Sequence, residues 1–227
     1  MDFEGFVLAA STGDLSEEPA AREHADAVEF RMDLAETPGE ALADYDGDLP
    51  LLVTNRPTWE GGEREDGPER VQELLDALEQ PAVEAVDVEL DAVTDGTDHT
   101  DATEVLAAAE AAGIDVVVST HDFSGTPALG ELADLAAATT ALGDVGKVAV
   151  TAEHSGQVLD LLRVTYEFAT AGHQLATMAM GHPGKHSRVV APIYGSSIGY
   201  APVDAEAATA PGQYDLALLR TLVDALL

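Results

Sequence analysis

The sequence contains no cysteine, which excludes disulfide bonds and thiolate chemistry. It contains only two lysines, Lys147 and Lys185. No run of about 18 apolar residues, the length that a membrane-spanning helix needs, occurs anywhere in it. No basic segment precedes an apolar run near the first residue, so the pattern of a signal peptide is missing as well. From these absences we expect a cytoplasmic protein that does not bind membranes.

Positive charge is also scarce. The 10 Lys and Arg residues face 43 Asp and Glu residues, which gives a net charge of −33 and a pI near 4.1. A field of this sign repels nucleic acids and anionic membranes, so we expect neither as a partner. The acids are spread along helix faces rather than gathered in a tail, and apolar periodicity continues throughout. This pattern is typical of a folded halophilic protein, because salt screens the self-repulsion of such a surface.

Apolar strand patterns alternate with helix patterns along all 227 residues, without a linker or a low-complexity segment. Eight such units predict an α/β fold, a (β/α)8 TIM barrel that forms one compact domain over residues 1–227. A doubly wound open sheet is the competing architecture, but no G-x-G-x-x-G motif follows the first strand. The expected strands are Gly5–Ser11, Ala27–Leu34, Leu49–Arg56, Ala82–Asp91, Ile114–Phe123, Val145–Thr151, His173–Met180 and Ser197–Pro202. The expected helices begin at Ser16, Pro38, Pro68, Asp101, Ala128, Ser155, Lys185 and Pro211.

One of the two lysines, Lys147, lies in the middle of the apolar strand Val145–Thr151. An ammonium group removed from water either pairs with an opposite charge or loses its proton. A deprotonated lysine attacks a carbonyl carbon and forms an imine, which makes Lys147 a candidate nucleophile. The structural alternative is a lysine at a strand end that pairs with an acidic neighbour.

Other polar residues fall at the carboxyl ends of the expected strands, where the active sites of such barrels lie. Histidine titrates near neutral pH, so His121 suits proton transfer, and Glu60 would hold it in its working tautomer. Arg56 and Arg188 suit the binding of a carboxylate and of hydroxyl groups. With Lys147, these residues predict imine-assisted chemistry on a small, anionic, hydroxylated ketone.

Several of these residues also have a structural explanation. His121 followed by Asp122 fits a surface turn, and Glu29 and Arg31 fit an ion pair inside the barrel. His182 and His186 have the i,i+4 spacing of a metal-binding pair. No third ligand is evident near them, so we expect no metal site.

Six segments resemble the motifs of the type I 3-dehydroquinate dehydratase family, the class I dehydroquinases of the shikimate pathway. The first four are EFRMD at 29–33, TNRPTWEGG at 54–62, STHDF at 119–123 and DVGKVA at 144–149. Met180-Gly181 with Ser187-Arg188, and the APGQ of residues 210–213, agree with two later family segments. Each segment alone is a weak signal. The set is specific, because the segments occur in family order and cover most of the chain.

The resemblance implies a lyase that converts 3-dehydroquinate to 3-dehydroshikimate and water, with neither a metal nor an organic cofactor. It implies that Lys147 is the Schiff-base lysine, that His121 is the general acid/base and that Glu60 hydrogen-bonds this histidine. The substrate-binding residues that it implies are Glu29, Arg31, Arg56, Arg188, Thr209 and Gln213, with Ser11 or Thr12 as a first-strand hydroxyl. Thr209 stands where the family usually has serine, and Tyr200 stands where an aromatic residue is often found.

The resemblance further implies that residues 203–213 form a loop that closes over the small-molecule substrate. Dimers are common in the family, so a homodimer is compatible with the resemblance, although the sequence shows no interface signature. Two alternatives are a class I aldolase, which shares the lysine and the barrel, and an idle barrel that serves as a binding protein. The aldolase would not need the EFRMD and TNRPTWEGG segments together, and a covalent adduct on Lys147 would exclude the idle barrel.

Overall fold

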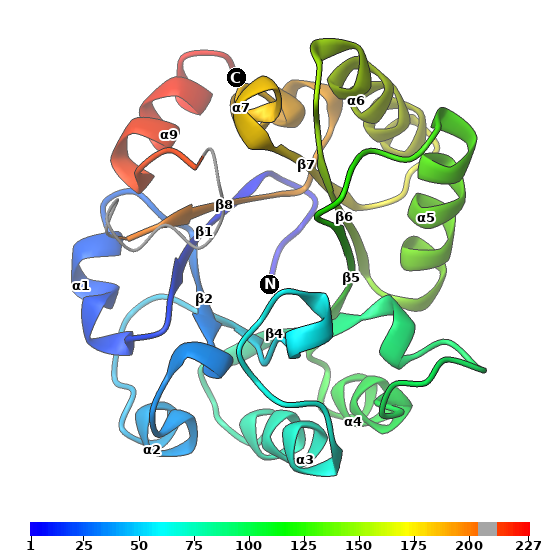
Figure 1. The fold of residues 1–227 in the computed structure, drawn as a ribbon. Helices are drawn as coiled ribbons and strands as arrows, with labels where there is room; N and C mark the ends of the chain where they lie inside the picture. Colours follow the sequence, from blue (N-terminus) through cyan, green and yellow to red (C-terminus); the bar gives the residue numbers. More distant parts are fainter. Residues whose placement is uncertain (204–212) are drawn as a thin grey trace.

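The computed structural model describes residues 1–203 and 213–227. Its eight parallel strands form one sheet in the neighbour order β7-β6-β5-β4-β3-β2-β1-β8. The Ser197 amide donates a hydrogen bond to the Leu175 carbonyl at 3.0 Å, which brings β7 beside the start of β8 and nearly closes the barrel. Seen along the barrel axis, the helices surround the strands (Figure 1). The expected (β/α)8 architecture is therefore confirmed, and the open-sheet alternative is wrong.

The strands are β1 Val7–Thr12, β2 Ala27–Arg31, β3 Leu51–Thr54, β4 Val83–Glu89, β5 Asp115–Asp122, β6 Val145–Thr151, β7 Leu175–Met180 and β8 Ile198–Pro202. The helices are α1 Glu18–Ala21, α2 Pro38–Ala43, α3 Pro68–Ala77, α4 Thr103–Ala112, α5 Leu129–Leu142, α6 Ser155–Thr170, α7 Gly181–Gly184, α8 Ser187–Val190 and α9 Leu216–Asp224. Short 3-10 helices cover Leu15–Glu17, Met32–Leu34, Thr58–Glu60, Leu90–Ala92 and Ala191–Tyr194.

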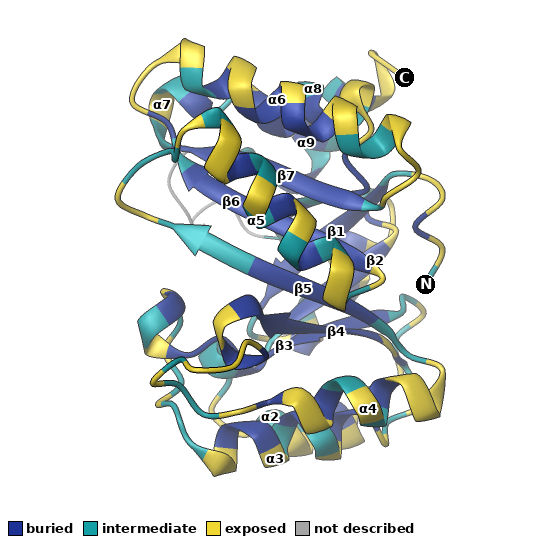
Figure 2. Cartoon of the chain, turned by 90° about the vertical axis from the view of Figure 1, so that its right-hand side faces the viewer, coloured by how far each residue is buried: buried dark blue, intermediate teal, exposed yellow. Residues whose placement is uncertain are grey.

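Alternation along the strands divides the core into two shells. On β6, Val145 and Ala149 belong to the cluster inside the barrel, whereas Val148 and Val150 pack outward against α5 and α6. Because successive side chains of a strand point to opposite faces, Lys147 faces the barrel interior with Val145 and Ala149. Figure 2 shows the result: the strands are largely buried, and the helices expose only their outer faces.

Helix ends follow local sequence signals. Gly113 ends α4 in the left-handed region at φ 71°, a conformation that glycine adopts without steric cost. The side chain of Asp215 caps α9 by accepting a hydrogen bond from the Leu218 amide. None of the helices within residues 1–203 and 213–227 combines the length and apolar character that crossing a bilayer requires.

The expected element boundaries needed several corrections. β2 ends at Arg31 and β4 at Glu89, because a 3-10 helix follows each strand directly. The final helix begins at Leu216 rather than at Pro211, which lies outside the described residues. The single helix expected over residues 185–193 is in fact α8 followed by a 3-10 helix.

Candidate active site

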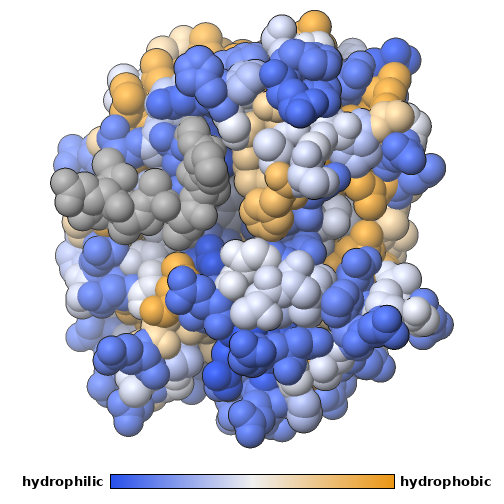
Figure 3. Space-filling view, viewed as in Figure 1, coloured by the Kyte–Doolittle hydropathy of each residue, from blue (hydrophilic) through white to orange (hydrophobic). Residues whose placement is uncertain are grey.

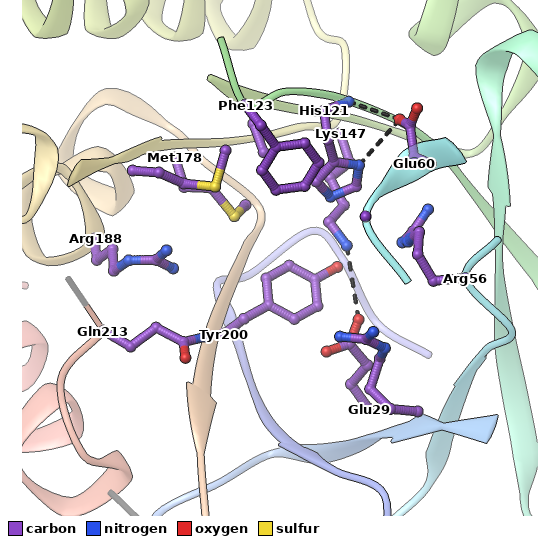
Figure 4. A pocket seen from close by; sticks show the side chains of 14 residues that line it. Glu29, Arg56, Glu60, His121, Phe123, Lys147, Met178, Arg188, Tyr200 and Gln213 are labelled. Atoms are coloured by element: carbon purple, nitrogen blue, oxygen red, sulfur yellow. Dashed lines mark hydrogen bonds and ion pairs between the residues drawn. The ribbon is translucent and has the colours of Figure 1, made fainter. Parts of the chain in front are cut away.

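The carboxyl ends of the strands surround a pocket (Figure 4). The molecule is hollowed near the centre of this face (Figure 3). Residues from six different strands or the loops that follow them converge on the pocket, as expected for a barrel of this type. Its lining includes eight of the residues named from the sequence: Glu29, Arg31, Arg56, Glu60, His121, Lys147, Arg188 and Gln213.

The Lys147 side chain crosses the barrel interior and is almost completely buried, with 3% of its surface exposed. Its Nζ lies 2.9 Å from Oδ2 of Asp87 and 3.6 Å from Oε1 of Glu29. The same nitrogen lies 4.2 Å from the centroid of the Tyr200 ring. Of the two fates open to a buried ammonium group, ion pairing is therefore the one that the structure displays.

A chain of buried opposite charges continues from Lys147 and Asp87 to Arg70 on α3. Arg56 is 2.9 Å from Asp87 and 2.8 Å from Glu89, and it donates a hydrogen bond to Ser119 Oγ at 2.7 Å. Arg70 on α3 then pairs with the second oxygen of Glu89 at 2.9 Å. Burying so many charges is costly, and this order of alternating signs offsets the cost.

The charge chain determines how its carboxylates titrate. Burial opposes ionisation of Asp87, but the charges of Arg56 and Lys147 outweigh it and hold its pKa well below the ordinary value. For Glu89, burial prevails over the attraction of Arg56 and Arg70, so its pKa is raised. Asp87 is therefore an anion throughout the neutral range.

Asp87 and Glu89 were not identified as site residues from the sequence. The sequence did contain a sign of their shared location, because they occupy alternate positions of an apolar strand and must therefore face the same side. Arg70 was also missed, since it resembles one more charged residue of an amphipathic helix. Nothing in the sequence indicated that it is fully buried.

His121 and Glu60 form a second pair at the rim of the pocket. Oε1 of Glu60 accepts a hydrogen bond from the backbone amide of His121 at 2.7 Å and lies 3.1 Å from its Nδ1. When Nδ1 carries the hydrogen, this contact leaves Nε2 with a free lone pair. The expected orienting contact between Glu60 and His121 is thus present.

Burial dominates the titration of this pair. It lowers the pKa of His121 well below the ordinary value, and the positive charges of Arg56 and Lys147 lower it further. Burial also raises the pKa of Glu60 to about 7. At neutral pH His121 is therefore an uncharged imidazole that can accept a proton.

Phe123 covers the outer side of His121, with nearly parallel rings whose centroids are 6.0 Å apart. The Phe123 ring also lies over Gly61, whose φ is 82°. A Cβ atom at residue 61 would stand 2.5 Å from this ring, so both the backbone and the contact require glycine there.

Glu29 and Arg31 do not form the expected pair. Glu29 accepts hydrogen bonds from Ser11 Oγ at 2.6 Å and Thr54 Oγ1 at 3.2 Å. Arg31 instead binds Asp33 through Nε at 2.7 Å and Nη2 at 2.6 Å, because the 3-10 helix after β2 turns Asp33 back toward it.

Of the two first-strand hydroxyls, only Ser11 contacts the carboxylate of Glu29. Thr12 Oγ1 donates to Glu17, away from the pocket. Thr209 lies outside the described residues, so its expected role in substrate binding stays a prediction.

Arg188 and Gln213 lie across the pocket from Lys147 (Figure 4). Arg188 is 6% exposed, and within the described residues its Nε has no hydrogen-bond partner. Burial lowers its pKa to about 10, which still leaves a cation at neutral pH. A buried guanidinium group that faces a pocket and has a free N–H donor is suited to binding an anion.

Within residues 1–203 and 213–227, no group of three or more His, Asp or Glu side chains is arranged to hold a metal ion. The functional groups that line the described pocket are an amine, an imidazole, carboxylates, guanidinium groups, a phenol and an amide.

Comparison with known proteins yields a consistent result. The model of the type I 3-dehydroquinase family matches residues 9–226. The chain is 53% identical over 223 residues to the 3-dehydroquinate dehydratase of Halobacterium salinarum, covering 98% of each chain. It is 56% identical over 223 residues to that of Haloarcula marismortui, covering 98% of this chain and 97% of the relative. Among solved structures it resembles the 3-dehydroquinate dehydratase of Geobacillus kaustophilus, with a TM-score of 0.83, 27% identity and coverage of 97% of this chain and 90% of the other.

Proposed function

The chain belongs to the type I 3-dehydroquinase family and is a 3-dehydroquinate dehydratase, and we propose that it works through an imine between its substrate and Lys147. One observation carries this mechanism: the buried amine of Lys147 shares a pocket with the neutral imidazole of His121 and the cation of Arg188, whose Nε has no hydrogen-bond partner among the described residues. The family match also sets aside the class I aldolase and the idle barrel.

In the first step, Lys147 gives up a proton and its Nζ attacks the ketone carbon of 3-dehydroquinate. The carbonyl oxygen takes up two protons in all and leaves as water, so that a positively charged imine forms. Asp87 lies 2.9 Å from this nitrogen and remains an anion, so it stabilises the positive charge that the imine retains.

In the second step, the cationic imine withdraws electrons from the neighbouring carbon and makes its C–H bond acidic. His121 takes this proton, and the electron pair of the C–H bond forms an enamine. The enamine then expels the β-hydroxyl group, which leaves as water with a proton from His121. Glu60 supports both transfers by holding Nδ1 of the imidazole.

In the third step, water adds to the imine carbon and releases 3-dehydroshikimate, which restores the Lys147 amine. Over the whole cycle the substrate loses one hydrogen and one hydroxyl group, and the water used for hydrolysis equals that lost in imine formation. No redox change occurs, so the cycle balances with the enzyme's own groups.

Substrate recognition follows from the charges around the pocket. Arg188 binds the substrate carboxylate, because this pairing neutralises a guanidinium group that is already buried. Glu29, Arg31 and Gln213 bind ring hydroxyl groups from the surrounding wall. Arg56 acts chiefly through Asp87 and Glu89, since its guanidinium group is occupied by them. Ser11 orients Glu29 through its hydrogen bond, and Thr209 is a further substrate-binding residue.

Two further expectations are part of this proposal: a cytoplasmic location and a homodimeric assembly. The first is consistent with a small-molecule lyase, and the second rests on the family resemblance. Cell fractionation tests the location, and sedimentation in molar salt tests the assembly.

The decisive experiment traps the imine. Borohydride added with 3-dehydroquinate or its product should fix the ligand to the enzyme as a stable amine, which mass spectrometry locates on Lys147. Lys185→Ala is the matched control, because the chain contains only one other lysine and it lies over the Tyr214 ring. The adduct should persist in Lys185→Ala and vanish in Lys147→Ala.

Turnover, followed by the ultraviolet absorbance of the conjugated product, should vanish with the adduct in Lys147→Ala. Circular dichroism checks that this variant is folded. An adduct of equal yield in a folded Lys147→Ala protein would refute the imine mechanism while leaving the family assignment intact.

A further inference from the structure

The side chain of Tyr200 places a buried hydroxyl group at the active-site pocket. Tyr200 lies on β8, in register with Ala9 of β1, and belongs to the cluster that fills the barrel interior. Only 5% of its surface is exposed. Within the described residues its hydroxyl has no hydrogen-bond partner. Figure 4 shows the ring lying between Lys147 on one side and Arg188 and Gln213 on the other.

This hydroxyl is unusual among its neighbours. The hydroxyl groups of Ser11 and Thr54 both donate to Glu29. Tyr45, far from the pocket on the outer side of the barrel, donates its hydroxyl hydrogen to the Leu49 carbonyl at 2.7 Å. A buried hydroxyl without a partner lowers the stability of the free protein, so its presence at the pocket points to a partner that arrives with the ligand.

The ring of Tyr200 has a separate task that needs no hydroxyl. Nζ of Lys147 lies 4.2 Å from the ring centroid, within range of a cation–π interaction. A phenylalanine ring would support this contact in the same place. The ring therefore explains an aromatic residue at this position, and the hydroxyl group needs its own explanation.

Burial also settles the protonation state of the hydroxyl. It raises the pKa of Tyr200 well above the ordinary value, and the negative charges of Glu29 and Asp87 raise it further. The group is therefore a neutral hydrogen-bond donor at any pH at which the enzyme works. The carboxylate of Glu29, on the same side of the pocket, supplies the complementary acceptor.

We propose that the Tyr200 hydroxyl binds the substrate directly, donating a hydrogen bond to an oxygen of the cyclic, polyhydroxylated ligand on the Lys147 side of the pocket. The inference rests on the proposed function, because the oxygen that accepts this hydrogen bond belongs to the substrate bound to Lys147. A ring hydroxyl group fits best: its oxygen accepts from Tyr200 while its hydrogen is donated to Glu29. The carboxylate of the substrate is excluded from this position, because Arg188 binds it across the pocket.

The test compares Tyr200→Phe with the wild type, and Tyr45→Phe serves as the matched control. Tyr200→Phe keeps the ring beneath Lys147 and removes only the hydroxyl. Its melting temperature should equal or exceed that of the wild type, while kcat/KM should fall roughly tenfold, mainly through KM. Tyr45→Phe removes a satisfied hydrogen bond, so its melting temperature should fall while kcat/KM stays unchanged.

Each outcome separates this inference from the proposed function. A Tyr200→Phe enzyme with wild-type kcat/KM and KM would refute substrate contact. A fall in both melting temperature and kcat/KM would show that the hydroxyl serves the fold instead. Borohydride should still trap the imine in Tyr200→Phe. A wild-type protein that neither turns over nor is trapped would overturn the imine mechanism, and this inference with it.

Discussion

Asp87 lies at the centre of the charge chain, and removing its charge is the most informative single change. It contacts Lys147 Nζ at 2.9 Å, Arg56 Nη2 at 2.9 Å and Ser119 Oγ at 2.5 Å, and it is fully buried. Asp87→Asn keeps the size and shape of the side chain but removes the charge. Arg56 would retain Glu89, whereas Lys147 would retain only the more distant carboxylate of Glu29 at 3.6 Å.

The structure sets the expected size of the effect. Removing one partner of a buried ion pair costs about 3–5 kcal/mol, because the remaining charge stays buried without compensation. For a domain of this size each kcal/mol lowers the melting temperature by about 2–4 °C, so we expect a loss of roughly 6–20 °C. Asp48→Asn is the control: Asp48 pairs with Arg22 on the surface, where such pairs contribute about 0–1 kcal/mol.

Thermal unfolding followed by circular dichroism, at constant molar salt and several pH values, measures this difference. The pKa of folded Asp87 is depressed, so its stabilising contribution is fully present above the unfolded pKa and is lost only as pH falls through the folded value. The gap between Asp87→Asn and the wild type should therefore stay constant from pH 8 to pH 5 and narrow only in strong acid. A gap at pH 7 no larger than that of Asp48→Asn would refute the reasoning.

Three further predictions concern catalysis and salt. The pKa of Glu60 is about 7, so its charge is lost as pH falls below neutrality, and kcat/KM should fall with it because His121 loses its ionised partner. Glu60→Gln should flatten this acidic side of the pH profile of kcat/KM. A profile of unchanged shape in Glu60→Gln would contradict the role of Glu60 in holding His121. Arg188→Met should raise KM at least tenfold without lowering the melting temperature, since it removes a buried cation whose Nε has no hydrogen-bond partner among the described residues; an unchanged KM would exclude Arg188 from substrate binding. With a net charge of −33, the melting temperature should rise as sodium chloride increases from millimolar to molar, and a salt-independent value would contradict adaptation to high salt.

The barrel could be predicted because each buried strand appears in the sequence as a short run of apolar residues. β6 has the expected boundaries, Val145–Thr151, since its apolar, β-branched residues are flanked by Gly143-Asp144 and a polar segment. β2 was predicted three residues too long. Met32, Asp33 and Leu34 continue the alternation of the strand in sequence, but after Arg31 the backbone has already turned into a 3-10 helix.

The candidate catalytic residues could be named from their motifs, whereas the buried charges that support them could not. A lysine within an apolar strand is rare, and the apolar residues around Lys147 indicate that it is buried. Asp87 and Glu89 occur in a chain with 43 acidic residues, so two more carboxylates carry little information until the facing side of the strand is known. The Glu29–Arg31 pairing failed for a related reason, since alternation predicts a shared face but not which of several acids an arginine contacts.

The buried guanidinium group of Arg188 also bears on how an anionic substrate reaches a protein with a large negative charge. The reactant is itself an anion, so the long-range field of a body carrying −33 charges opposes its diffusional approach, and the local potential of Arg188 acts only over the last few ångströms. Dissolved ions shorten the reach of that field to about 3 Å at 1 M. We therefore expect molar salt to favour substrate association as well as stability, because it screens the repulsive surface charge while Arg188 still attracts the substrate inside the pocket.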